Sequence, residues 1–210
     1  RLVGSEMCIR DRIEPIVHMT CRDRNVNASK ALLLGLNLEN ILNIITITGD
    51  PVPTAEKDEV KSVFQFNSTK FATLVSDMNE KVFTNKMNIG GALNLNANKF
   101  DLEIKRAQAK EKAGVNVFYT QPVISKTAVE NLKIARKELK SYIMGGVMPI
   151  VSYKNALFMN SEASGIRLDD EIIERYKGLE REEASRLAVE ITSDFMRQIA
   201  DYVDGYYIIT

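Results

Sequence analysis

Polar side chains follow several short apolar segments of this 210-residue chain, and their chemistry suits the binding of a flat organic ligand. The side chains that can donate or accept hydrogen bonds at these points are His18, Thr20, Asp50, Asn94, Thr120, Gln121 and Asn155. Ligands of parallel α/β sheets bind at the carboxyl ends of the strands, because the loops vary there while the scaffold stays constant. Imidazole, carboxylate and amide groups among apolar walls predict a site for a large heteroaromatic ligand.

Some of these residues also have a purely structural explanation. His18 is the only histidine and can equally be a buried imidazole that hydrogen-bonds within the core. Asp50 lies between a glycine and a proline, where aspartate often bonds its own backbone in a turn. Gln121 precedes a proline, which holds its backbone extended and leaves its side chain without such a local explanation. Cys21 has no second histidine to activate it, so we expect a small buried thiol rather than a nucleophile.

The composition argues against several classes of function. Basic and acidic residues number 28 each, so the net charge is zero and predicts neither a nucleic-acid nor a membrane-surface partner. The longest apolar runs, 41–47 and 147–151, are far shorter than the roughly 20 residues that cross a bilayer. One histidine with scattered carboxylates predicts no metal site, and no P-loop pattern occurs. Two cysteines without a secretory signal predict a reducing cytoplasm.

Six β-rich segments alternate with segments of helical period, which predicts parallel strands joined by crossover helices. The predicted strands are Pro15–Thr20, Ile41–Thr48, Lys86–Leu93, Val115–Gln121, Tyr142–Val151 and Tyr206–Thr210. One helix is expected to bury Ala128, Leu132, Ala135 and Leu139, and a later helix Ala184, Leu187, Ala188, Ile191, Phe195 and Ile199. About 33 residues per strand is close to the size of one βα unit.

This spacing predicts an α/β fold of the TIM-barrel type that is incomplete. A full (βα)8 barrel needs roughly 250 residues, so the chain is expected to be two βα units short. A doubly wound open sheet is the competing fold, although the glycine fingerprint that usually follows its first strand is absent. Residues 13–210 are expected to form the barrel. Residues 1–12 have no regular period and are interpreted as a non-native segment, similar to a translated sequencing adapter, or else as a frayed natural terminus.

Six segments, in order along the chain, resemble methylenetetrahydrofolate reductase. They are HMTCRDRN at 18–25, ITGDP at 47–51, SVFQFNS at 62–68, KAGVNVFYTQPV at 112–123, MPIVSYKNALF at 148–158 and DGYYIIT at 204–210. They are most similar to the reductase module that follows a homocysteine S-methyltransferase domain in some bacterial bifunctional proteins. The resemblance implies a flavin-containing (βα)8 barrel, here without its first two βα units and its last helix. For the intact protein, an N-terminal methyltransferase domain and a homo-oligomer are then candidate partners.

The resemblance also implies an activity, in which FAD carries the hydride chemistry. NADH or NADPH reduces FAD and leaves, and 5,10-methylenetetrahydrofolate then accepts the hydride to become 5-methyltetrahydrofolate. The residues that match cofactor-binding positions of the family are His18, Thr20, Gly49, Asp50, Asn94, Glu103 and Lys110. His18, Thr20, Gly49 and Asp50 match positions beside the flavin. Asn94 matches a position near the FAD phosphates or ribose. Glu103 and Lys110 match positions at the distal part of FAD.

The resemblance further implies residues that act on the folate. Asp50 is the catalytic candidate, because a fixed carboxylate stabilises the cationic iminium form of the folate in a site that excludes water. Gln121, preceded by Thr120, matches the residue that hydrogen-bonds the pterin ring, and a planar amide both donates and accepts along such an edge. Met159 lies near the position of an aromatic residue that packs on substrate in relatives.

Two features depart from the family pattern. The family's general acid, a glutamate on the first barrel strand, has no counterpart, since Glu14 precedes the third strand of the pattern. Residues 92–96 also lack the usual aromatic residue and proline. We therefore expect this chain alone to bind FAD poorly and to reduce folate slowly. A non-catalytic flavin- or folate-binding remnant is the alternative, and an unrelated barrel lyase or aldolase would need a strand-end lysine, which is not well placed here.

Overall fold

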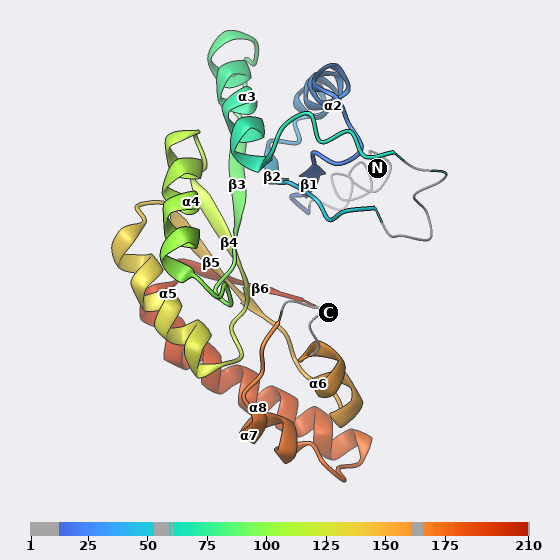
Figure 1. Ribbon diagram of the computed structural model, residues 1–210, viewed down its shortest axis with the longest axis vertical. Helices are drawn as coiled ribbons and strands as arrows, with labels where there is room; N and C mark the ends of the chain where they lie inside the picture. The colour runs from blue at the N-terminus through green and yellow to red at the C-terminus, as the bar shows by residue number, and fades with distance from the viewer. Residues whose placement is uncertain (1–12, 53–58, 60, 161–165, 210) are drawn as a thin grey trace. The chain divides into compact units, whose positions relative to one another are not determined.

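The structure is a computed structural model that describes residues 13–52, 59, 61–160 and 166–209 (Figure 1). The segment 1–12, predicted to be non-native, lies outside the described residues. The strands are β1 (Ile16–Thr20), β2 (Asn43–Ile47), β3 (Asn88–Leu93), β4 (Val117–Pro122), β5 (Tyr142–Val147) and β6 (Gly205–Ile208). The helices are α2 (Val26–Leu38), α3 (Ser68–Lys81), α4 (Phe100–Lys112), α5 (Lys126–Glu138), α6 (Tyr153–Met159), α7 (Asp170–Arg175), α8 (Arg181–Ile199) and the 3₁₀ turn η2 (Ala200–Tyr202).

The strands follow one another in the sheet in the same order as in the chain, from β1 to β6. The pairs β1–β2, β2–β3 and β5–β6 are parallel. A doubly wound sheet reverses its direction at a switch point, and this order contains no reversal, so the doubly wound alternative is wrong. Continuous winding in one direction is instead the pattern of a βα barrel. Within the described residues the sheet stays open, with β1 and β6 as its end strands.

All six predicted strands exist, but each hydrogen-bonded ladder is shorter than the apolar segment that predicted it. The largest difference concerns the segment predicted as Tyr142–Val151, where β5 ends at Val147. Pro149 follows shortly after and has no N–H to donate to a neighbouring strand, so the ladder cannot continue through it. Apolar residues beyond the strand still contribute to the core, because Met148 and Ile150 are buried.

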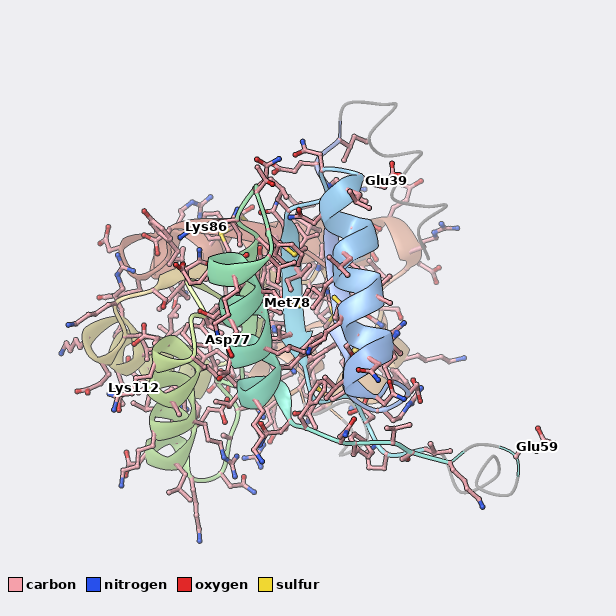
Figure 2. All side chains as sticks on the ribbon, turned by 90° about the horizontal axis from the view of Figure 1, so that it is seen from above. Glu39, Glu59, Asp77, Met78, Lys86 and Lys112 are labelled. Carbon is pink, nitrogen blue, oxygen red and sulfur yellow. The ribbon has the colours of Figure 1, made fainter. Side chains whose placement is uncertain are left out.

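The chain divides into two compact units, and each is described by itself. The first contains the chain up to Ala92 together with Ala109–Val117. Its helices begin at asparagine caps, because Asn25 Oδ1 accepts the N–H of Ala28 at 2.9 Å and Asn67 Oδ1 that of Lys70 at 3.0 Å. Both helices bury one apolar face; on α3, Met78 is buried while its neighbour Asp77 is exposed, and both are labelled in Figure 2.

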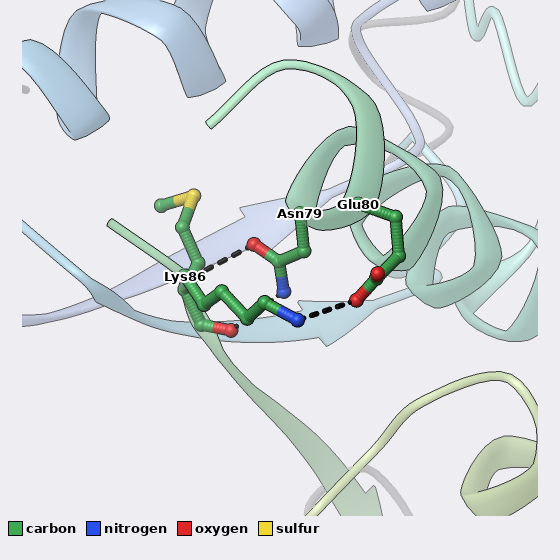
Figure 3. Close-up of polar contacts among 4 residues, drawn as sticks. Asn79, Glu80 and Lys86 are labelled. Carbon is green, nitrogen blue, oxygen red and sulfur yellow. Dashed lines mark hydrogen bonds and ion pairs between the residues drawn. The ribbon is translucent and has the colours of Figure 1, made fainter. Parts of the chain in front are cut away.

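Two hydrogen bonds of the Asn79 side chain fix the backbone just before β3 in this unit. The side-chain amide of Asn79 donates to Met87 O at 2.9 Å and accepts from Met87 N at 2.8 Å (Figure 3). Lys86 Nζ forms an ion pair with Glu80 at 2.7 Å in the same turn. Since Asn79 satisfies both backbone groups of one residue, the chain is fixed one residue before the β3 ladder starts.

The second unit contains Leu93–Gln108 and the chain from Phe118 onward. In α5 the predicted face is confirmed, since Ala128, Leu132 and Ala135 are buried and Leu139 is buried at the cap that follows. The predicted face of α8 is also confirmed, with Ala184, Ala188, Ile191, Phe195 and Ile199 buried and Leu187 partly exposed. A capping box starts α8, in which Glu180 accepts from the backbone of Glu183 and Glu183 from that of Glu180. No helix in the described ranges is long and apolar enough to cross a membrane.

Candidate functional site

The carboxyl ends of β1 and β2 lie level with each other in the first unit. Thr20 pairs with Ile47, and the N–H of the next residue, Cys21, donates to Ile47 O at 3.2 Å and to Thr48 O at 3.1 Å. Gly49 follows with a φ of 89°, which L residues rarely adopt. A Cβ on Gly49 would also lie 3.2 Å from the Cβ atoms of Thr20 and Arg22. The glycine therefore permits a close approach of the chain to the end of β1, one residue before Asp50.

His18 and Asp50 are both exposed at these strand ends. The exposure of His18 excludes the alternative of a buried core imidazole. His18 and Thr20 are two residues apart on β1 and so point to the same face of the sheet. No hydrogen bond joins the Asp50 carboxylate to the described residues, Val52 included, so the described backbone does not engage it in a turn. His18 and Asp50 are thus exposed among the described residues, and Thr20 is partly exposed.

The loop that precedes α3 packs on the same strand ends. Val63 N donates to Arg22 O at 2.6 Å, and Ser68 N donates to Thr48 Oγ1 at 3.2 Å. Within this loop Phe64 has a φ of 36° and is 37% exposed. A bulky residue in the left-handed region stores strain of order 1–3 kcal/mol. The sequence did not predict this conformation, because a phenylalanine carries no signal for a positive φ.

Cys21 is fully buried, and burial raises the pKa of its thiol to about 11. The thiolate is therefore disfavoured at neutral pH, and the prediction of a small buried thiol is confirmed. Lys110 belongs to the same unit, where its Nζ donates to Ala92 O at 2.7 Å near the end of β3. The ammonium group thus holds the backbone at the point where β3 ends.

In the second unit, the β3–α4 loop is organised by Glu103. The carboxylate is 8% exposed, and its Oε1 accepts the N–H of Asn94 at 3.1 Å. Asn94 is exposed, and its Oδ1 accepts the N–H of Asn96 at 2.9 Å. Both polar atoms of the Asn96 side chain are buried and have no hydrogen-bond partner among the described residues. A buried amide without a partner is costly, so this loop offers donor and acceptor capacity that the described chain does not use.

The end of β4 carries Thr120 and Gln121 in the same unit. Thr120 is 2% exposed; its Oγ1 accepts the N–H of Gly146 at 2.9 Å and donates to Gln121 O at 2.8 Å. Gln121 is partly exposed, and so is Met159, the last residue of α6. Helix α6 starts at Ser152, whose Oγ accepts the N–H of Asn155 at 3.0 Å. Thr120 therefore acts on the backbone, while Gln121 keeps a side chain that a ligand can reach.

The structure brings some of the predicted residues together within each unit. Thr20 and Gly49 touch in the first unit, and Asn94 and Glu103, like Thr120 and Gln121, are joined by hydrogen bonds in the second. Among the described residues, no three His, Cys, Asp or Glu side chains gather as metal ligands would.

A parallel α/β sheet wound in one direction defines an α/β protein whose strand order is that of a βα barrel, with polar side chains after its strands. The model of the methylenetetrahydrofolate reductase family matches residues 3–210, and the chain belongs to this family. No curated protein matches the chain in sequence.

Several solved structures are similar to the chain at low sequence identity. One is an uncharacterized protein from Clostridium thermocellum described as binding two copies of 5-methyl-5,6,7,8-tetrahydrofolic acid, with a TM-score of 0.48 and 12% identity over 98% of this chain and 92% of the other. Another is the tryptophan synthase alpha subunit of Legionella pneumophila, with a TM-score of 0.47 and 14% identity over 97% and 83%. A third, 4-hydroxy-tetrahydrodipicolinate synthase of Methylacidiphilum fumariolicum, has a TM-score of 0.43 and 13% identity over 92% and 67%.

Proposed function

We propose that the protein reduces 5,10-methylenetetrahydrofolate to 5-methyltetrahydrofolate with NADH or NADPH, using FAD as its cofactor in a ping-pong reaction. The observation that carries the proposal is the family match over residues 3–210. Accessible polar side chains at the ends of β1, β2 and β4 support it, because a flavin and a pterin both need hydrogen bonds around a flat ring. We further propose a cytoplasmic location, and a homo-oligomer or an attached methyltransferase domain as partners of the intact protein.

The described residues fit FAD in two places. At the ends of β1 and β2, Gly49 lies so close to Thr20 that position 49 has no room for a side chain. His18 and Asp50, which are close to these residues in the sequence, are exposed. In the β3–α4 loop, the partnerless amide of Asn96 lies next to Asn94 in a segment matched to the FAD phosphates or ribose. Glu103 and Lys110 would contribute to FAD binding indirectly. Each bonds a main-chain group at the end of β3 and so fixes the backbone there.

Bound FAD would take the hydride from the nicotinamide and pass it to the folate. The residues of this chain would orient the reactants. His18, Thr20 and Gly49 would hold the flavin ring, and the Asp50 carboxylate would stabilise the positive charge that develops on the folate. Gln121 would bind the edge of the pterin ring through its amide, while Thr120 fixes the adjacent backbone and Met159 packs on the substrate.

The two half-reactions of the full-length gene product test the proposal. We expect the purified protein to be yellow, to lose its flavin absorbance on mixing with NADH or NADPH, and to recover it with methylenetetrahydrofolate. A folded protein that takes up no FAD would overturn the proposal. Binding of FAD and folate without turnover would instead identify the non-catalytic remnant.

A further inference from the structure

Two adjacent tyrosines on β6 each donate a hydrogen bond to a main-chain carbonyl, on opposite sides of the sheet. Tyr206 Oη donates to Met196 O, in α8, at 2.8 Å. Tyr207 Oη donates to Thr120 O, in β4. Successive side chains of a strand point to opposite faces, so one hydroxyl reaches the helix that covers the sheet and the other reaches across the opposite face. Each tyrosine thus caps one main-chain carbonyl, which makes the pair an internal control.

The carbonyl that Tyr207 caps lies near the end of β4, where a side chain also joins β4 to β5. The N–H of Gly146 donates to the Thr120 side chain, and Gly146 O accepts the N–H of Val123. The Oγ1 of Thr120 in turn donates to Gln121 O. Buried main-chain carbonyls need a donor, and Thr120 is 2% exposed, so the Tyr207 hydroxyl bonds a carbonyl in a residue that is almost closed to solvent.

Gly146 is what allows the Tyr207 ring to reach β4. A Cβ on Gly146 would lie 3.0 Å from both Thr120 O and Tyr207 Oη and 3.1 Å from Tyr207 Cζ. A Cβ on Gly145 would instead meet Ile199 Cδ1 and Val203 Cγ1 at 3.1 Å and Tyr206 Cδ1 at 3.6 Å, with no atom of Tyr207 among its three nearest neighbours. The Tyr119 ring packs edge-on against Tyr207, with ring centres 5.6 Å apart. Gly146 has no side chain and so leaves room for the Tyr207 ring, and the Tyr119 ring packs against it. Together they hold the Tyr207 hydroxyl against the Thr120 carbonyl.

Burial raises the pKa of Tyr207, and the neighbouring Tyr119 acts in the same direction. The hydroxyl therefore remains protonated, and able to donate, throughout the neutral range.

We propose that Tyr207 is a positioning residue that sets the backbone at Thr120–Gln121 and thereby the orientation of the Gln121 amide toward the pterin ring. This inference depends on the folate-binding role of Gln121 in the proposed function. Without the tyrosine hydroxyl, the buried Thr120 carbonyl loses this donor, and the peptide that carries Gln121 is held less firmly. An amide that is no longer held loses directed hydrogen bonds to a heterocycle.

The matched variants Tyr207→Phe and Tyr206→Phe test this role, because each removes one hydroxyl from β6. We expect Tyr207→Phe to raise the KM for methylenetetrahydrofolate by about tenfold, the effect of one lost hydrogen bond to a bound ligand, with FAD affinity unchanged. Tyr206→Phe should leave that KM unchanged although it loses an equivalent bond. Equal effects of the two variants on the KM, or no effect of Tyr207→Phe, would overturn the inference.

Amide hydrogen exchange of the protein without ligands separates this inference from the proposed function. Tyr207→Phe should speed exchange in a peptide covering 117–124, and Tyr206→Phe should not. If the wild type binds no folate while this exchange difference appears, the proposed function fails and the backbone role of Tyr207 stands. Unchanged exchange in both variants would refute the backbone role itself.

A second pair of variants approaches the same contact from β5. Gly146→Ala should displace the Tyr207 ring and reproduce the rise in KM, whereas Gly145→Ala should not. In the double variant Gly146→Ala with Tyr207→Phe, the KM should match that of Gly146→Ala alone, because both changes remove one interaction. Additive effects would show that the two residues act separately and would contradict the inference.

Discussion

The ends of β1 and β2 differ from the ends of β3 and β4 in how their polar side chains are used. At the first two strands, His18 and Asp50 are exposed, and no hydrogen bond joins the Asp50 carboxylate to the described chain. At the other two, Glu103 and Thr120 are buried and bonded to main-chain groups. Polar side chains thus stay exposed to solvent in one region and hold the backbone in the other, and burial distinguishes the two arrangements.

Asp50→Asn tests the exposed end and has the largest expected effect. We expect folate reduction to fall by about a hundredfold or more, because an amide cannot stabilise a developing positive charge as a carboxylate does. Nicotinamide oxidation should fall much less, and the free energy of unfolding should not change. Stopped-flow measurement of each half-reaction gives the answer, with Asp77→Asn on α3 as the exposed control. An equal loss in both half-reactions would refute the assigned role.

Glu103→Ala tests the buried end and should act on stability. The N–H of Asn94 would lose its acceptor, so unfolding free energy should fall by about 1–3 kcal/mol. Glu103→Gln keeps an acceptor and should lose less, and Asp101→Asn, exposed on the same helix, should change little. Denaturant unfolding measures all three. If Glu103→Ala stayed fully stable and lost only FAD affinity, Glu103 would act in cofactor binding and not in holding the loop, which would contradict this prediction.

Gly49→Ala separates backbone requirement from side-chain chemistry at the exposed end. The positive φ and the 3.2 Å approach to Thr20 and Arg22 predict a loss of about 1–2 kcal/mol in unfolding free energy. Gly35→Ala is the matched control, because nothing lies within 4 Å of its Cβ and the residue is inside α2, where alanine gains about 0.5–1 kcal/mol. Stabilisation by both substitutions would show that the Gly49 conformation is not needed.

Tyr176→Phe tests an exception among the buried polar groups of the second unit. Tyr176 is 1% exposed, its hydroxyl has no partner among the described residues, and burial raises its pKa to about 12. Removing that hydroxyl should raise stability by up to about 1 kcal/mol.

The same substitution predicts a change at alkaline pH. The unfolded chain releases the tyrosine proton near its ordinary pKa of about 10, so the wild type loses stability as the pH rises from there toward 12. Tyr176→Phe should lose less over that range, and Tyr142→Phe, on an exposed residue, should behave like the wild type. Thermal unfolding at pH 8 and pH 11 compares them, and identical alkaline losses would contradict the assignment.

The sequence predicted the elements well because their signals are local. Short β-rich segments located six strands, and the helical period located the buried faces of α5 and α8, including Ala128 and Ile191. The same patterns overestimated strand length, since apolar residues such as Ile150 fill the core beyond the last ladder bond. The predicted site residues lie after the strands as expected, but exposure could not be predicted, so His18 stayed ambiguous until its surroundings were known.

By itself the amino-acid sequence determined the alternation of strands and helices, the family, and the set of polar residues that follow the strands. Only the tertiary structure decided the order of the strands in the sheet, the strained backbone of Phe64 and the exposure of Asp50 against the burial of Glu103. It also revealed the contact between Tyr207 and Thr120, which are 87 positions apart. Propensity and periodicity act over a few residues, whereas burial and hydrogen-bond partners depend on segments that meet only after folding.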